Sequence, residues 1–112
     1  MAGMTASQRR WEAWFDAYAK IDGGWPERIE LPCPEGDGGR VQIAYLAGRE
    51  GGKGMVFVWC DRCRTGIFLH RVRIPDDAPR LPHGATEDEI DKIIPPDTVF
   101  LPPDPAIEPL PD

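Results

Sequence analysis

The first clear pattern of apolar positions covers residues 5–22, where hydrophobic side chains recur every three or four residues. This spacing places them on one face of an amphipathic helix. Thr5 followed by Gln8 has the form of an N-terminal capping box, and the glycines after residue 22 end the pattern. We therefore expect an N-terminal helix whose apolar stripe packs on a sheet; the stripe consists of Trp11, Trp14, Phe15, Tyr18 and Ile21.

Three β-prone segments follow this helix. Residues 41–46 alternate between apolar and polar side chains, and residues 55–59 form the continuous apolar run that is typical of a central strand. Residues 67–74 begin apolar and then alternate. Because the connecting segments are rich in turn residues and of hairpin length, the pattern predicts a three-stranded antiparallel sheet.

Proline is concentrated in the C-terminal third of the chain, where ten of the thirteen prolines lie in residues 75–112. This stretch divides into two segments, residues 75–101 and residues 102–112. Proline removes backbone donors and disrupts regular strand pairing. Within the first of these segments, residues 86–94 have the pattern of a short helix, with Thr86 as its N-cap and Glu89 completing a capping box. We expect the first segment to wrap on the domain as a proline-rich extension and the second to be a flexible C-terminus.

Length and composition fit one small α+β domain at residues 1–101. A hydrophobic content of 41% with four tryptophans argues for a real core. Net charge is −6 but uneven: −3 for residues 1–39, +4 for residues 40–80 and −7 for residues 81–112. An acidic total disfavours nucleic acid as the default ligand, because phosphate neutralisation carries much of that affinity.

The chain shows neither a signal peptide nor a membrane-spanning run, so a cytoplasmic protein is expected. Ten arginines against three lysines suggest a GC-rich bacterial source.

The stretch V-W-C-D-R-C, which ends in Cys60 and Cys63, carries the strongest chemical signal. It resembles the W-C-x-x-C motif of thioredoxin-like proteins, in which a long helix begins at the motif and lowers the pKa of the first thiol. Here R-T-G and a β-prone segment follow the second cysteine. A thiol oxidoreductase using these two cysteines is therefore the least favoured function.

The wider sequence context resembles a zinc ribbon, in which two Cys-x-x-Cys knuckles on β-turns bind one zinc ion. The resemblance covers about residues 31–74. Cys33-Pro34-Glu35-Gly36 is a degenerate first knuckle, and Cys60-Asp61-Arg62-Cys63 is an intact second knuckle. The resemblance implies a small zinc-ribbon-like protein in which one structural zinc ion is bound by Cys33, Cys60 and Cys63.

The fourth metal ligand is open at this point, because Gly36 occupies the position of the missing cysteine. Asp37 or Glu35 could supply a carboxylate oxygen, and His83 could fold back from the proline-rich segment. His70 is disfavoured, since it lies about four residues along a strand, roughly 13 Å from the turn. A metal-free domain, in which the cysteines act as small buried hydrophobic residues, is the competing hypothesis.

Four arginines form a second candidate site, for binding nucleic acid or for pairing with the acidic C-terminal part. They are Arg62, Arg64, Arg71 and Arg73, the last two expected on one strand face with Ile67 and Leu69.

The expected function is non-catalytic, because the sequence contains no recognisable catalytic constellation. We expect a small intracellular interaction or adaptor protein with a protein partner, without membrane attachment or a small-molecule substrate. Two alternatives stay open. One is a nucleic-acid-binding zinc-ribbon accessory protein that uses the four arginines; the other is an acidic, immunity-type protein that neutralises a basic toxin.

Overall fold

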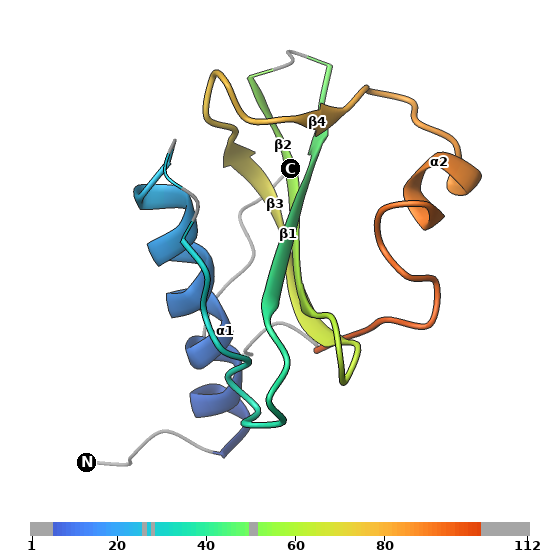
Figure 1. Cartoon of the computed structure of the whole chain (residues 1–112). Helices are drawn as coiled ribbons and strands as arrows, with labels where there is room; N and C mark the ends of the chain where they lie inside the picture. The colour runs from blue at the N-terminus through green and yellow to red at the C-terminus, as the bar shows by residue number, and fades with distance from the viewer. Residues whose placement is uncertain (1–5, 26, 28, 50–51, 102–112) are drawn as a thin grey trace.

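The computed structural model describes residues 6–25, 27, 29–49 and 52–101 of the chain. It shows an α+β fold with an N-terminal helix and a mixed five-stranded sheet (Figure 1). The elements in chain order are α1 (Ala6–Gly23), β1 (Val41–Ala47), β2 (Lys53–Cys60), β3 (Thr65–Arg73), β4 (Arg80–Leu81), α2 (Glu87–Asp91) and β5 (Val99–Phe100).

The strand order is β4-β1-β2-β3-β5, so the expected three-stranded antiparallel sheet is wrong in its extent. The antiparallel meander β1-β2-β3 is present, with the apolar β2 at its centre. Two-residue strands from the proline-rich segment then pair in parallel at each edge, β4 on β1 and β5 on β3. Pro79 and Pro82 flank β4 and keep it short, because proline cannot donate a backbone hydrogen bond.

Both faces of the sheet are covered. Successive residues of β2 point to opposite sides, so the strand contributes side chains to a cluster on each face. Val56, Val58 and Cys60 pack with α1 in the larger hydrophobic cluster, to which the helix contributes its buried Trp11, Trp14, Ala17 and Ile21. Trp59 packs on the other face with Ile94, in a smaller cluster. Figure 1 accordingly shows α1 and α2 on opposite sides of the strands. Trp11, Trp14 and Ile21 of the helical stripe are buried and Tyr18 is partly buried, whereas Phe15 is 39% exposed and stacks on Trp11.

A bulge interrupts β3 and changes which arginines share a face. Arg71 has a φ of 56°, and the register with β2 shifts between Gly54 and Val56. Leu69 and Val72 consequently pack against the same core cluster. The expectation that strict alternation places Arg71 and Arg73 on one face with Leu69 is therefore wrong, because the extra residue reverses the alternation.

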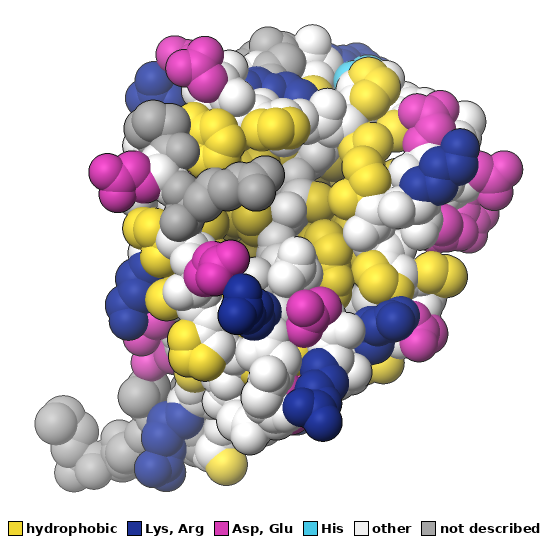
Figure 2. All heavy atoms as spheres, in the orientation of Figure 1, with side chains coloured by type: hydrophobic (Ala, Val, Ile, Leu, Met, Phe, Trp, Pro, Cys, Tyr) yellow, Lys and Arg dark blue, Asp and Glu magenta, His cyan; other side chains and the backbone are white. Residues whose placement is uncertain are grey.

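The proline-rich segment contains the predicted short helix, α2. Thr86 is its N-cap, and its hydroxyl accepts a hydrogen bond from the Glu89 N–H at 3.2 Å. The helix is strongly acidic and exposed, and Figure 2 shows acidic side chains gathered on that side of the molecule. The expected flexibility of residues 102–112 concerns positions outside the described residues. Within the described part, neither helix has the length and apolar character needed to cross a bilayer.

Candidate metal centre

The first half of the site is a tight loop that precedes β1. The Cys33 N–H donates to the Gly39 carbonyl at 2.9 Å and closes the loop, and the Gly36 N–H donates to the Cys33 carbonyl at 2.9 Å. The Glu35 N–H points at Cys33 Sγ, 3.3 Å away. Gly36 has a φ of +76°, a conformation that glycine adopts without strain. The loop therefore turns as a knuckle although it contains only one cysteine.

The second half is the turn between β2 and β3. Cys60 ends β2, and its Sγ accepts from the N–H groups of Arg62 at 3.3 Å and Cys63 at 3.5 Å. The Arg64 N–H donates to the Cys60 carbonyl at 3.1 Å, while Arg64 itself adopts a φ of 56°. Each knuckle thus directs the N–H of the second residue after its first cysteine at that cysteine's sulfur, so the two turns share this local geometry.

Backbone contacts hold the two turns side by side. The Asp61 N–H donates to the Arg40 carbonyl at 3.1 Å, and the Arg40 N–H donates back to Asp61 Oδ1 at 2.9 Å. Val41 of β1 pairs with Cys60 of β2 next to these bonds. The sheet register therefore brings together the sulfurs of Cys33 and Cys63, which are 30 residues apart in sequence.

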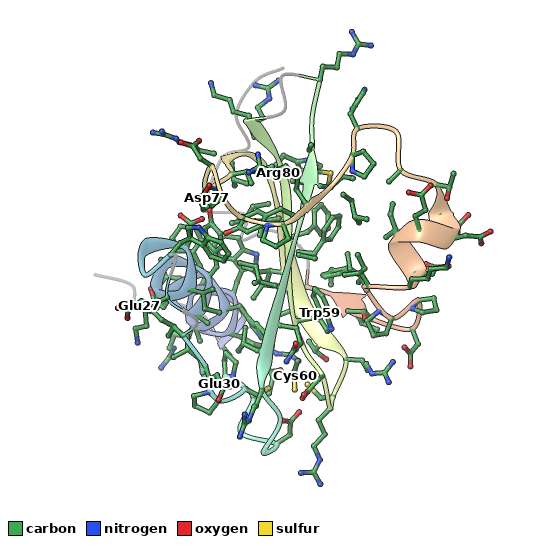
Figure 3. All side chains as sticks on the ribbon, turned by 45° about the horizontal axis from the view of Figure 1, so that its top comes forward. Glu27, Glu30, Trp59, Cys60, Asp77 and Arg80 are labelled. Atoms are coloured by element: carbon green, nitrogen blue, oxygen red, sulfur yellow. The ribbon has the colours of Figure 1, made fainter. Side chains whose placement is uncertain are left out.

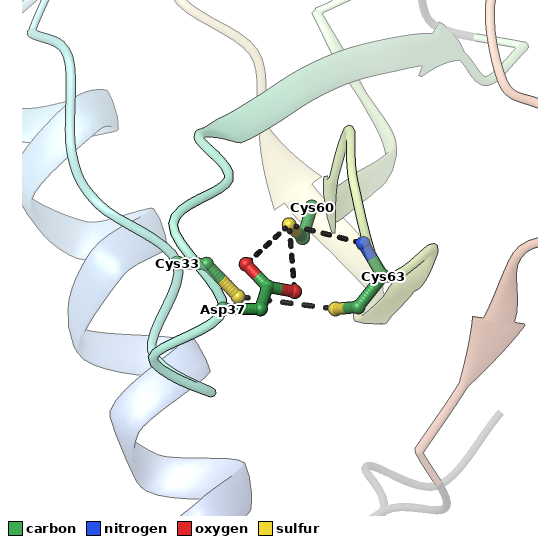
Figure 4. Close-up of side chains that lie close together, drawn as sticks. All are labelled: Cys33, Asp37, Cys60 and Cys63. Carbon is green, nitrogen blue, oxygen red and sulfur yellow. Dashed lines mark hydrogen bonds between the residues drawn. The ribbon is translucent and has the colours of Figure 1, made fainter.

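Four side chains converge where the turns meet (Figure 4): Cys33, Asp37, Cys60 and Cys63. One ligand atom from each lies within 4.8 Å of all the others, and the three cysteines are free thiols. The sulfurs of Cys33 and Cys63 are 3.9 Å apart, and Cys60 Sγ lies 3.4 and 3.5 Å from the two carboxylate oxygens of Asp37. These four residues lie close enough to bind one metal ion.

The distances match those expected around a tetrahedral zinc ion. Two thiolates bound to one zinc lie about 3.8 Å apart, and a thiolate and a carboxylate oxygen lie about 3.5 Å apart. The 3.9 Å between Cys33 and Cys63 is far longer than a disulfide bond of about 2.05 Å. The donor set also contains three soft sulfurs, which favour zinc over calcium or magnesium.

Without a metal, the site favours protons on Cys33 and Cys63 and a negative charge on the carboxylate of Asp37. Burial raises the pKa of Cys33 to about 12 and also raises the pKa of Cys63, with the Asp37 carboxylate as a further cause. Hydrogen bonds from Cys63 and from the Gly39 N–H lower the pKa of Asp37 to about 2. A bound dication reverses this preference, because it attracts the thiolates and takes the place of their protons.

Asp37 is the predicted fourth-ligand candidate that the structure brings to the cysteines. The carboxylate of Glu35 turns away and pairs with Arg10 of α1. His83 follows β4, which pairs with the far end of β1, whereas Cys60 pairs with Val41 at the near end. Figure 3 shows Arg80 of β4 and Cys60 at opposite ends of the sheet. His70 is exposed on β3, where its ring packs edge-on against Phe68.

The four predicted arginines do not gather in one place. Arg62 and Arg64 lie at the turn beside the cysteines, and Arg64 pairs with Asp97 at 2.6 Å. Arg71 and Arg73 lie at the other end of β3, roughly 20 Å away at the rise of a strand. The Arg64–Asp97 pair is of the kind expected between these arginines and the acidic C-terminal part.

The Cys60–Cys63 segment lies on a turn between two strands. Cys60 is fully buried, and the residues after Cys63 enter strand β3, so no helix begins at the motif. Comparisons with known protein families, curated proteins and solved structures find no match for this chain. The resemblance to a zinc ribbon therefore stays a prediction from the sequence.

Proposed function

We propose that this chain is a small, non-catalytic interaction protein, with a zinc-ribbon-like centre in which one structural zinc ion is bound by Cys33, Asp37, Cys60 and Cys63. The observation that carries the proposal is the convergence of these four donors within 4.8 Å of one another, with the Cys33–Cys63 and Cys60–Asp37 pairs at the spacing expected around zinc. Four protein ligands complete the coordination of zinc. A closed site of this kind stabilises a fold, whereas a catalytic zinc keeps one position for water or substrate.

The pattern of burial supports a metal site over a metal-free core. In a metal-free core the cysteines replace hydrophobic side chains, so all three should be buried and no charge should lie among them. Cys33 and Cys60 are buried, but Cys63 is exposed and its sulfur nevertheless faces Cys33. A carboxylate also lies among the thiols, which suits a cation and does not suit a hydrophobic cluster.

The centre's place in the fold explains what the zinc ion would stabilise. Arg10 of α1 forms a surface ion pair with Glu35 of the loop before β1. Such exposed pairs contribute little stability. A zinc ion would join this loop to the end of the central strand β2 by four bonds. Because the large core on α1 does not depend on the metal, removal of zinc should not unfold the protein completely. We therefore expect a partial loss of stability.

The proposed interaction role draws on two exposed features of the C-terminal part. Helix α2 presents Glu87, Asp88 and Glu89 to solvent, and Val99 of the edge strand β5 is 63% exposed. An acidic surface with apolar side chains nearby suits a basic protein partner. A photo-crosslinker placed at Val99 tests this role in cells: the proposal expects one adduct of defined mass. The same crosslinker at exposed Arg49 is the matched control.

Thermal unfolding with and without zinc tests the structural role. With zinc at a hundred to a thousand times its Kd, the linkage between binding and folding should stabilise the protein by about 3–4 kcal/mol. For a domain of this size, that corresponds to a rise in Tm of roughly 10 °C or more. Magnesium at the same concentration should leave Tm unchanged, because its preferred ligands are oxygens. An unchanged Tm with zinc would contradict the proposal.

A further inference from the structure

The three thiols of the proposed zinc site differ in access to solvent. Cys60 is fully buried and Cys33 is 5% exposed, whereas Cys63 is exposed at the turn after β2. An oxidant from solvent therefore reaches Cys63 first. The susceptibility of a thiol to oxidation follows its access and its thiolate character, and zinc binding makes all three ligands thiolates.

The sulfur of Cys33 lies 3.9 Å from that of Cys63. A shift of about 2 Å brings the two sulfurs to disulfide distance, and Cys63 lies on an exposed turn. Cys60, in contrast, is fully buried, and its sulfur accepts from two N–H groups. The access of Cys63 and its short distance to Cys33 favour a disulfide between these two residues.

Formation of this disulfide removes two of the four proposed zinc ligands. Loss of Cys33 and Cys63 as thiolates leaves only Cys60 and the Asp37 carboxylate. One thiolate and one carboxylate form a far weaker zinc site, because a structural zinc site needs four ligands. The new disulfide would join the loop before β1 to the β2–β3 turn, which are the same two segments that the zinc ion joins.

We propose that the centre is a peroxide-responsive zinc switch, in which hydrogen peroxide converts Cys33 and Cys63 to a disulfide and releases the metal. This proposal rests on the proposed zinc site. The Cys63 thiolate attacks peroxide, forms a sulfenic acid and displaces hydroxide. The Cys33 thiolate then attacks the sulfenic sulfur and displaces a second hydroxide. Two sulfurs lose two electrons, peroxide gains them, two protons from solvent convert the hydroxides to water, and zinc leaves as Zn²⁺.

Because the disulfide replaces the metal as a cross-link, the folded domain persists in both states. The oxidised form differs in the loop around Asp37, whose carboxylate loses its cation. A thiol reductant together with zinc restores the first state. The switch thus couples the metal content of the protein to the peroxide level around it.

The test treats the zinc-loaded full chain with a small excess of hydrogen peroxide and follows it by native mass spectrometry and disulfide mapping. The expected result is one zinc ion released for each Cys33–Cys63 disulfide formed, and recovery of both after reduction with zinc present. Cys63→Ser should lose this disulfide and react with peroxide at least tenfold more slowly. Circular dichroism checks that this variant is folded.

Four other outcomes overturn the inference, and they are distinguishable. Zinc that stays bound while peroxide is consumed, or release with a disulfide that includes Cys60, contradicts the switch and leaves the zinc site standing. Oxidation of Cys63 to sulfinic acid without any disulfide also contradicts the switch and leaves the zinc site standing. A chain that takes up no zinc before peroxide is added contradicts the proposed function itself, and the switch with it.

Discussion

Gly39 and Cys60 lie so close that no other residue type fits at position 39: a Cβ there would be 2.4 Å from Cys60 Sγ and 2.7 Å from Arg62 Cβ. The first knuckle passes directly over the buried thiol of the second. Gly39→Ala should push the two turns apart, which should destabilise the zinc-loaded protein by about 1–3 kcal/mol, the usual cost of overpacking. It should also weaken zinc binding. Chemical denaturation with zinc present measures the first effect.

Gly23→Ala is the matched control for this substitution. Gly23 ends α1, and a Cβ there meets nothing within 4 Å. The change should be neutral or stabilise the protein by up to about 1 kcal/mol. Equal effects of the two substitutions would mean that the close approach of Gly39 to Cys60 has no part in stability.

Asp37 should be the carboxylate that matters for metal affinity. Asp37→Asn removes a charged ligand and should weaken zinc binding by more than the 10- to 100-fold typical of residues that only orient ligands. Glu35→Gln, two residues away, removes an equal charge that pairs with Arg10 instead. Its zinc affinity should stay within about threefold of wild type, in the range of screened surface charges. Competition with a chromogenic chelator measures both, and equal losses would remove Asp37 from the ligand set.

Zinc affinity should rise with pH, because each ligand thiol must lose its proton. Burial raises the pKa of Cys33 to about 12, and that of Cys63 is raised too, so protons are bound to both at neutral pH in the metal-free protein. The pKa of Asp37 is lowered to about 2, so its carboxylate is already charged. Calorimetry in buffers of different ionisation enthalpy should show proton release on zinc binding. Binding without proton release would contradict a thiolate site.

Tyr45 should make the fold sensitive to alkaline pH. Its hydroxyl donates to Asp22 Oδ1 at 2.8 Å and so ties β1 to the end of α1. Burial, and then Asp22, raise its pKa above the ordinary value near 10. A raised pKa stabilises the fold fully below about pH 10, and the effect is lost as pH rises toward the folded-state value.

Tyr45→Phe tests this dependence, and comparison with wild type cancels other titrating groups. Below about pH 10 the variant should be less stable by about 1–3 kcal/mol, the contribution of a hydrogen bond to a charged group. Above that pH the difference should shrink, since only wild type loses stability through this group. A difference that stays constant to high pH would contradict the assignment.

The sequence predicted the elements that have long periodic patterns. It missed those that depend on contacts with segments distant in the sequence. The helical pattern predicted at residues 5–22 and the three β-prone segments have enough periodic positions to be recognised, and they correspond to α1 (Ala6–Gly23), β1, β2 and β3. Strands β4 and β5 have two residues each, so they have no periodicity, and their pairing depends on where neighbouring segments end. Arg71 adopts a left-handed conformation that its residue type does not signal.

The same distinction applies to the metal centre. Local spacing identified the three cysteines, and it placed Asp37 among the candidates for the fourth ligand. It could not choose between Asp37 and Glu35, because the choice depends on Arg10, which is 25 residues from Glu35 and reaches it from α1. Gly36 stands where a second cysteine would be. The next residue, Asp37, is the one whose carboxylate lies among the sulfurs.

The metal content of the native protein tests the central claim most directly. Native mass spectrometry of the full chain, purified without chelators, should show one zinc ion per chain. Cys60→Ser should lose that mass, since Cys60 is the buried ligand at the centre of the site. Glu35→Gln should keep it. A wild-type chain that is folded, has reduced cysteines and carries no metal even after incubation with zinc would contradict the account.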